Sequence, residues 1–264
     1  MDFKGDFVLS RGGRCHPLTA LDDFSRFNII LTAWDNERTE TVANCLERAF
    51  SSYGLPDTIL CDNGSPWGCA SRWQDNDAAG YTTLEVWLMA RGVGVIHGRP
   101  YHPQTQGKEE RFHRTLKADV ISRKMVWCGI ADCGERFAPW RDKYNHKHPH
   151  ESLDGQVPAS RYRVSNRCYE GAVDEREFYR EGENARVVRA KGEIHFRSRT
   201  LYIGTAFRGK SVAIWEAGDG ITDLYFGAFR IRQIDWQNGI EGKPRGHNER
   251  VKSVRREEAN PVCS

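Results

Sequence analysis

Short apolar runs separated by turn residues dominate the first 165 residues of the chain. Five of them have the length and apolar content of strands. These runs are Phe3–Leu9, Cys15–Leu21, Phe27–Trp34, Thr58–Cys61 and Val93–His97. The first two flank the pair Gly12 and Gly13, which predicts a hairpin.

Apolar residues at helical spacing follow the third run. Val42, Leu46 and Phe50 recur every four residues within Glu37–Tyr53, and Gly54 predicts the end of this helix. Further helices are expected at Leu84–Arg91, Gly107–Ile121 and Ile130–Tyr144. Three strands followed by alternating helices and strands predict an α/β domain with a mixed sheet.

The pattern changes after residue 165, where the α/β domain is expected to end. Residues 166–185 are charged and are interpreted as a linker or short helices. Residues 186–237 alternate in strand-sized runs separated by Gly or Asp, which predicts a small antiparallel β-barrel. Residues 238–264 hold few apolar side chains and are expected to form a disordered tail.

Composition indicates a globular chain but leaves its partner open. The 264 residues include 39 Lys and Arg against 36 Asp and Glu, for a net charge of +3. This total neither demands nor excludes nucleic acid. No window approaches the roughly 20 apolar residues of a membrane helix, and the start MDFKGDF lacks the basic and apolar regions of a signal peptide. We therefore expect a soluble, intracellular protein without a membrane partner.

Position along the chain selects among the acidic residues. Asp2 lies on the first strand, and Asp62 follows the fourth, at the carboxyl edge where ligands gather in open α/β sheets. Glu109 and Glu110 open the helix after the fifth strand, where acids often only complement the helix dipole. Helical periodicity separates them, because Glu109 falls on the apolar side with Phe112 and Glu110 falls on the other side.

The side of this helix that carries Glu110 is basic. His113, Arg114 and Lys117 lie within about 60° of Glu110 at 100° per residue. The segment Arg99–Lys124 contains seven basic residues against three acids. A carboxylate within a basic stripe suits a site that holds divalent cations together with phosphates. A solvated helix face explains the stripe equally well.

Four longer sequence blocks occupy the first 165 residues. They are LTALDDFSRF (18–27), ILCDNGSPW (59–67), HGRPYHPQTQGKEERFHRTLK (97–117) and YNHKHPHESLDGQVPASRY (144–162). Together, and in this order, they resemble the integrase core shared by retroviral integrases and bacterial insertion-sequence transposases, with the bacterial branch the closer match. The resemblance implies that residues 1–165 form an integrase-type catalytic core. The implied fold is ribonuclease-H-like, a mixed five-stranded sheet with flanking helices. Residues 186–237 resemble the small barrel that often follows this core.

The resemblance also implies a DNA-processing site. The family's acidic triad falls on Asp2, Asp62 and Glu110, which would hold two Mg²⁺ or Mn²⁺ ions for phosphoryl transfer without a covalent enzyme intermediate. The residues implied to contact DNA are Gln106, on a mobile loop, and Lys108, Arg111, His113, Arg114 and Lys117. The implied activity is that of a DDE-type polynucleotidyl transferase, which cleaves DNA at transposon ends and joins it to target DNA. The implied setting is a homo-oligomer on DNA, in a bacterial cytoplasm and associated with the nucleoid.

Two features depart from the family pattern. Glu109 stands where family members usually carry an apolar residue such as Val, and an extra acid there would raise neighbouring pKa values or point to solvent. Asp2 follows Met1 directly, whereas the family has more strand and a helix-turn-helix module upstream. The chain is therefore expected to be N-terminally truncated, with this DNA-reading module missing or separately encoded.

Alternatives remain for both the site and the function. Asp22 and Asp23 compete with Asp2 for the first metal position, although Asp23 is also placed to bond the backbone of Ser25. The His-x-His-x-His run within residues 146–150 could bind zinc or nickel. The chain could also be a nuclease of the same fold that hydrolyses DNA without joining it, or an inactive DNA-binding remnant of a transposase.

Overall fold

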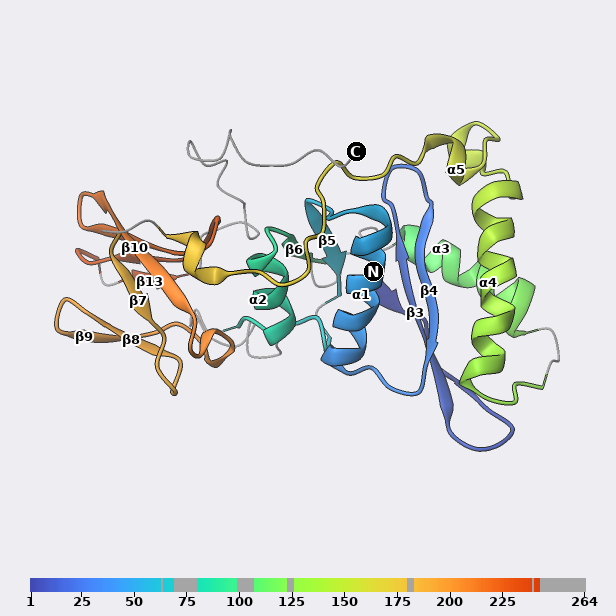
Figure 1. Cartoon of the computed structure of the whole chain (residues 1–264), viewed down its shortest axis with the longest axis horizontal. Coiled ribbons are helices and arrows are strands. Elements are labelled where there is room, and N and C mark those ends of the chain that lie inside the picture. Colours follow the sequence, from blue (N-terminus) through green and yellow to red (C-terminus); the bar gives the residue numbers. More distant parts are fainter. Residues whose placement is uncertain are drawn as a thin grey trace. The chain divides into compact units, whose positions relative to one another are not determined.

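The chain folds into two compact units, each assembled from two segments (Figure 1). The computed structural model describes residues 1–62, 64–68, 80–98, 107–122, 126–179, 183–238 and 240–242. The first unit comprises Met1–Gly54 with Gly98–Asn166, and the second comprises Leu55–His97 with Arg167–Ser264.

A four-stranded antiparallel sheet forms the centre of the first unit. Its strands are β1 (Asp2–Phe3), β2 (Phe7–Val8), β3 (Arg14–Leu21) and β4 (Asn28–Trp34). Both β1 and β2 pair with β3, through Asp2 opposite Thr19 and Phe7 opposite Cys15. The expected hairpin is confirmed, but its first strand is interrupted between Phe3 and Phe7. The other expected strand, β4, also pairs antiparallel with β3.

Helices cover both faces of this sheet (Figure 1). They are α1 (Thr39–Tyr53), α3 (Gly107–Leu116), α4 (Ile130–Lys147) and the short α5 (Pro158–Arg161). A π-helical turn at Lys117–Ile121 continues α3, and a 3-10 turn at Glu151–Leu153 follows α4. As expected, α1 ends at Gly54, whose φ of 73° lies in the left-handed region that favours glycine.

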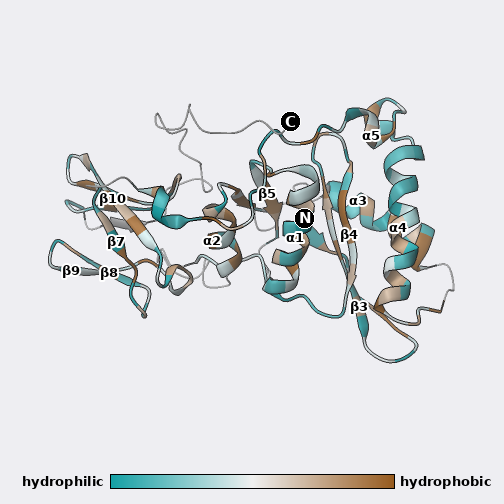
Figure 2. Cartoon of the chain, in the orientation of Figure 1, coloured by the Kyte–Doolittle hydropathy of each residue, from teal (hydrophilic) through white to brown (hydrophobic). Residues whose placement is uncertain are grey.

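The core of the first unit lies between the sheet and the pair α3 and α4. Phe112 and Leu116 of α3 and Phe137 of α4 are buried together with Cys15 and Leu31 of the sheet. Strand β4 contains many apolar residues, whereas much of α4 is polar (Figure 2). In α3, Phe112 and Leu116 lie on the same apolar face, and this face packs against the core.

The segment Leu55–His97 forms a strand–helix–strand element in the second unit. Strand β5 (Thr58–Cys61) pairs in parallel with β6 (Gly94–His97), in a register that sets Cys61 opposite His97. Helix α2 (Thr83–Ala90) lies between them in the chain, as a parallel connection requires. Thr82 and Glu85 form a capping box at the first turn of α2.

An open antiparallel sheet forms the rest of the second unit. Its strands, in spatial order, are β13 (Ile240–Gly242), β12 (Phe229–Asp235), β11 (Ile221–Phe226), β10 (Ser211–Gly218) and β7 (Ala185–Val187). Strands β8 (Glu193–Phe196) and β9 (Arg199–Tyr202) form a separate hairpin. Single 3-10 turns lie at Glu175–Phe178 and Thr205–Phe207. In the described residues the sheet runs openly from β13 to β7, so the expected closed barrel is not confirmed.

The α/β class expected for the core is confirmed. Among the described residues the expected core strands are present, β1 to β4 in an antiparallel sheet of the first unit and β5 with β6 in a parallel pair of the second. Part of the expected tail forms β13, and its residues from 243 onward lie outside the described residues. Across the described part of the chain, no helix is both long enough and apolar enough to cross a membrane.

Candidate functional site

Asp2 is fixed by its backbone to the central strand of the first unit. It pairs with Thr19 of β3, and the Thr19 hydroxyl lies 3.0 Å from the Asp2 carbonyl oxygen. Thr19 is completely buried, whereas Asp2 is partly exposed. The sequence thus places this carboxylate next to the core on a strand that is only two residues long.

The two glutamates at the start of α3 face opposite environments. Glu110 is exposed, whereas Glu109 is buried. The Glu109 carboxylate lies 3.1 Å from the Thr19 hydroxyl and accepts the Leu21 backbone N–H at 3.2 Å. The terminal ammonium of Met1 lies 3.4 Å from the same carboxylate. The separation of Glu109 from Glu110 by helical periodicity is confirmed, and the Glu109 side chain points inward.

His113 completes this buried cluster. Its Nε2 lies 2.8 Å from the Thr19 hydroxyl and 3.9 Å from the Glu109 carboxylate. Burial lowers the pKa of His113 to about 4, against the opposing effect of Glu109, and the nearby cations Lys4 and the Met1 ammonium lower the pKa further. The imidazole is therefore neutral at neutral pH.

One arrangement of hydrogens satisfies this cluster. If the neutral imidazole carries its hydrogen on Nε2, His113 donates to the Thr19 hydroxyl, which in turn donates its single hydrogen to Glu109 or to the Asp2 carbonyl. Thr19 therefore connects the strand that carries Asp2 with the helix that begins beside Glu110. We refer to Thr19, Glu109 and His113 as the β3–α3 cluster.

Asp62 occupies a turn at the carboxyl end of β5, in the second unit. Its Oδ1 accepts the Gly64 backbone N–H at 3.0 Å. A β-carbon at residue 64 would lie 3.1 Å from Asp62 Oδ2, so a side chain there would press on the carboxylate. The Asp62 side chain is thus held against the backbone that follows it in the chain.

His97 connects this turn to α2. Its Nδ1 lies 2.7 Å from the Asp62 carbonyl oxygen, and its Nε2 lies 3.0 Å from Glu85 Oε1. Both side chains are buried, with 9% of His97 and 2% of Glu85 exposed. The two ring nitrogens thus face an oxygen on each side, the Asp62 carbonyl and the Glu85 carboxylate.

Sequence analysis did not single out Glu85 or His97. Glu85 stands at the third position of its helix after Thr82, which is the ordinary signature of a capping box. The sequence did hold one signal that could have identified His97. It is the last residue of the strand that follows Asp62 along the chain, and parallel strands end at the same edge of a sheet.

Most basic residues expected on α3 are exposed. Arg111, Arg114 and Lys117 reach solvent with Glu110, as the periodicity predicts. His113 differs, because only 12% of its side chain is exposed and it hydrogen-bonds inside the β3–α3 cluster. The expectation that His113 shares the exposed basic face is therefore wrong.

The sequence also singled out Asp22 and Asp23, which precede β4, and Lys108, in the first turn of α3. Lys108 binds Asp23, with 2.5 Å between Nζ and the carboxylate. Asp22, and not Asp23 as expected, accepts the Ser25 backbone N–H, at 2.7 Å, and shapes this turn. Gln106 lies outside the described residues.

The donor chemistry of the three candidate carboxylates fits a divalent cation. Mg²⁺ and Mn²⁺ prefer carboxylate oxygens. Asp2 and Glu110 belong to the first unit and Asp62 to the second. Within the residues that the structure describes, no three His, Cys, Asp or Glu side chains form a group that could hold a metal ion. This includes the histidines of residues 146–150, two of which instead contact each other ring to ring.

Known protein families match both parts of the chain. Residues 1–103 match one family model described as an integrase core domain, and residues 91–158 match a second model with the same description. Residues 183–241 match the C-terminal domain of the IS481 family of transposases.

Individual relatives match somewhat more than half of the chain. An uncharacterised 31.7 kDa protein of insertion element IS407 from Burkholderia multivorans is 26% identical over 159 residues, which are 60% of this chain and 52% of the relative. A 39.2 kDa protein of insertion element IS476 from Xanthomonas euvesicatoria is 25% identical over 63% of this chain and 44% of its own length. The chain thus spans about half the length of these relatives.

A solved structure covers a similar part of the chain. The catalytic core domain of BIV integrase is 21% identical to it, with a TM-score of 0.43, over 61% of this chain and 91% of that domain.

Proposed function

Since the chain carries an integrase core domain followed by the C-terminal domain of an insertion-sequence transposase family, we propose that it catalyses metal-dependent cleavage of DNA and strand transfer at transposon ends. The observation that carries this proposal is the order of matched domains, core first and transposase C-terminal domain second. The proposal includes a ribonuclease-H-like arrangement of residues 1–165, a linker at 166–185, a barrel-like module at 186–237 and a tail at 238–264.

Asp2, Asp62 and Glu110 are the residues that we propose hold two Mg²⁺ or Mn²⁺ ions. Divalent ions, when bound, stabilise the charge that develops during phosphoryl transfer. Support comes from the chemistry of three carboxylates and from their positions on a strand, at the end of a strand and at the start of a helix. Glu109 is not part of this set, because its carboxylate is used inside the β3–α3 cluster.

The exposed basic face of α3 is the surface that we propose contacts DNA. Arg111, Arg114 and Lys117 are exposed there, next to Glu110. Lys108 and Gln106 stay in the proposed set, whereas the buried His113 would act only through its neighbours. Arginine and lysine would bind phosphates and fix the position of the DNA without reading its sequence. Two DNA ends would require at least a dimer, and end selection would need a helix-turn-helix module.

One assay tests the proposal and separates the rival activities. The full chain is incubated with Mg²⁺ or Mn²⁺ and labelled duplexes that carry the terminal repeats of the element. We expect joined products. Cleavage without joining would indicate a nuclease of the same fold, and the absence of any metal-dependent product would indicate an inactive DNA-binding remnant.

Matched substitutions test the residues. Asp62→Asn and Glu110→Gln should each reduce product by about a thousandfold or more, because each removes a carboxylate from the proposed metal-binding set. The control is Glu135→Gln, an exposed acid on α4, which should leave product formation unchanged. Full activity in the Glu110→Gln variant would contradict the site assignment.

A further inference from the structure

The turn that carries Asp62 is attached both locally and to a distant residue. Locally, Gly64 donates its N–H to the Asp62 carboxylate. The distant attachment runs from the Asp62 carbonyl to His97, which lies 35 residues further along the chain. Strand pairing explains why they meet, because Cys61 and His97 are opposite one another in the parallel register of β5 and β6.

Glu85 fixes the other side of the His97 ring. Its Oε1 faces His97 Nε2 at 3.0 Å, and its Oε2 accepts the Thr82 N–H at 2.7 Å. Only 2% of the Glu85 side chain is exposed. One carboxylate therefore caps α2 and holds the imidazole in a single orientation, with Nδ1 directed at the Asp62 carbonyl.

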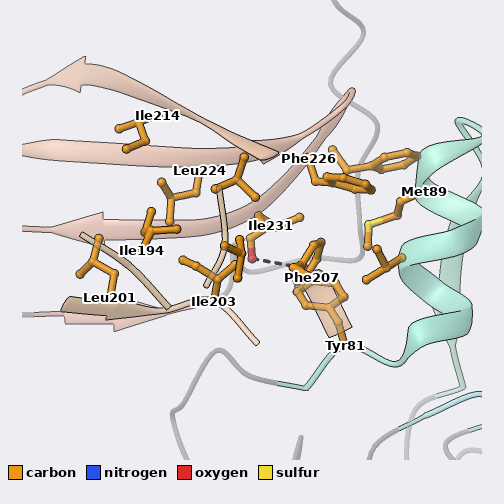
Figure 3. Close-up of a cluster of buried hydrophobic side chains, with 14 of the residues drawn as sticks. Tyr81, Met89, Ile194, Leu201, Ile203, Phe207, Ile214, Leu224, Phe226 and Ile231 are labelled. Carbon is orange, nitrogen blue, oxygen red and sulfur yellow. Dashed lines mark hydrogen bonds between the residues drawn. The ribbon is translucent and has the colours of Figure 1, made fainter. Parts of the chain in front are cut away.

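The helix that carries Glu85 is itself anchored. Its residues Val86 and Met89 are buried in a cluster with Phe207 and Phe226 of the C-terminal part of the second unit (Figure 3). Just before the helix, the Tyr81 hydroxyl donates to the Ile231 carbonyl oxygen at 3.2 Å. Burial of large apolar side chains of this kind resists displacement of the helix, so Glu85 provides a fixed reference for the ring.

We propose that His97 and Glu85 are positioning residues, which hold the Asp62 turn in the conformation that binds metal. The proposal rests on the proposed function, because it treats Asp62 as a metal-binding carboxylate. A side chain that is held in place before metal arrives loses less conformational freedom on binding. The hydrogen bond from His97 Nδ1 to the Asp62 carbonyl is the contact that does this.

Two substitutions of His97 separate its two hydrogen bonds. The amide nitrogen of Asn takes about the place of a histidine Nδ1, and that of Gln takes about the place of Nε2. His97→Asn should therefore keep the bond to the Asp62 carbonyl and lose the bond to Glu85. His97→Gln should do the reverse. The control is His195→Gln, which changes an exposed histidine of β8 in the same unit.

Mn²⁺ binding to the full chain, measured by calorimetry or paramagnetic resonance, is the first readout. His97→Gln should weaken binding about tenfold, and His97→Asn and the control should stay within about twofold of the unchanged protein. The Mn²⁺ affinity of Asp62→Asn serves as the reference for complete loss of the Asp62 carboxylate. Equal Mn²⁺ affinity in the Gln and Asn variants would overturn the proposal, including the case in which both lose affinity together with thermal stability.

Exchange of the Gly64 amide hydrogen, without metal, is the second readout. It should become faster in His97→Gln and stay slow in His97→Asn, because only the latter keeps the turn attached. If the unchanged protein binds Mn²⁺ no better than Asp62→Asn, the proposed function fails at this residue. A His97→Gln-specific rise in Gly64 exchange would then still support turn positioning, and unchanged exchange would overturn it. If His97→Gln does not fold, His97→Ala replaces it, because it also removes the bond to the Asp62 carbonyl; faster Gly64 exchange is expected, and unchanged exchange would contradict the proposal.

Discussion

In each of the two units the described residues include a largely buried histidine–glutamate pair beside a proposed metal-binding residue, and the two pairs differ in their hydrogen-bond partners. In the first unit, His113 Nε2 lies 3.9 Å from Glu109, with Thr19 between them, and the pKa of His113 falls to about 4. In the second, His97 Nε2 lies 3.0 Å from Glu85 and its Nδ1 faces a carbonyl.

The two pairs differ in whether a hydroxyl lies between the two side chains. Thr19 can both accept and donate, so it connects the neutral His113 to Glu109. Glu85 contacts the His97 ring directly and fixes its orientation towards the Asp62 carbonyl. The same two residue types thus form a bridged contact in one place and a direct contact in the other.

Removal of Glu85 should have the largest effect on stability. Glu85→Ala leaves His97 Nε2 without this partner in a buried place and also removes half of the α2 capping box. The free energy of unfolding should fall by about 3 kcal/mol, the combined cost of an unsatisfied buried group and a lost helix cap. Urea unfolding measures this loss, and hydrogen exchange should show that it occurs in the second unit. A loss below about 1 kcal/mol would mean that Glu85 does not anchor the ring.

Acid should act mainly through the first unit. The folded state binds a proton on His113 near pH 4 and the unfolded state near 6.5, so stability is full above pH 6.5 and falls as pH drops towards 4. The largest loss is about 3 kcal/mol. Lys4, Glu109 and the Met1 ammonium are the charged groups that act on this ring. Urea unfolding at several pH values should show the slope.

Two variants sharpen this expectation. His113→Gln should flatten the dependence of stability on pH between 6.5 and 4, because its amide does not titrate there. His195→Gln, which changes an exposed ring, should leave the slope as it is. A slope that survives in His113→Gln would assign the pH response to other groups.

Removal of Glu109 should cost less than removal of Glu85. Glu109→Ala leaves the Leu21 N–H, the Thr19 hydroxyl and the Met1 ammonium without this carboxylate, but it removes no helix cap. The expected loss is about 2 kcal/mol, measured by urea unfolding, and hydrogen exchange should show that it occurs in the first unit. A loss equal to that of Glu85→Ala would show that the direct and the bridged pair contribute alike.

Sequence periodicity was sufficient wherever neighbours in the chain determine the result. The helix that contains Val42, Leu46 and Phe50 ends at Gly54 as expected, and the spacing from Phe112 separates the buried Glu109 from the exposed Glu110. Local turn chemistry was less decisive, since Asp22 rather than Asp23 bonds Ser25. Both aspartates could have reached it.

Long-range pairing was beyond sequence analysis. His97 meets Asp62 only because β5 and β6 pair in one particular register, and Glu85 reaches the ring only because α2 packs where it does. The closed barrel was expected from strand spacing alone, but spacing does not decide whether the end strands meet; the described sheet is open. The inward direction of His113 likewise depends on Thr19, which stands on a distant strand.

The buried cluster around Met89 combines residues from distant parts of the chain, and this affects when the cluster can form during synthesis of the protein. Met89 is buried with Phe207 and Phe226, which a ribosome adds much later. Before these residues emerge, α2 has no partner for its apolar side, so we expect the Asp62 segment to mature only after them. A nascent chain would then have no competent metal-binding turn until Phe226 has left the ribosome, which would delay any cutting of DNA until that stage of translation.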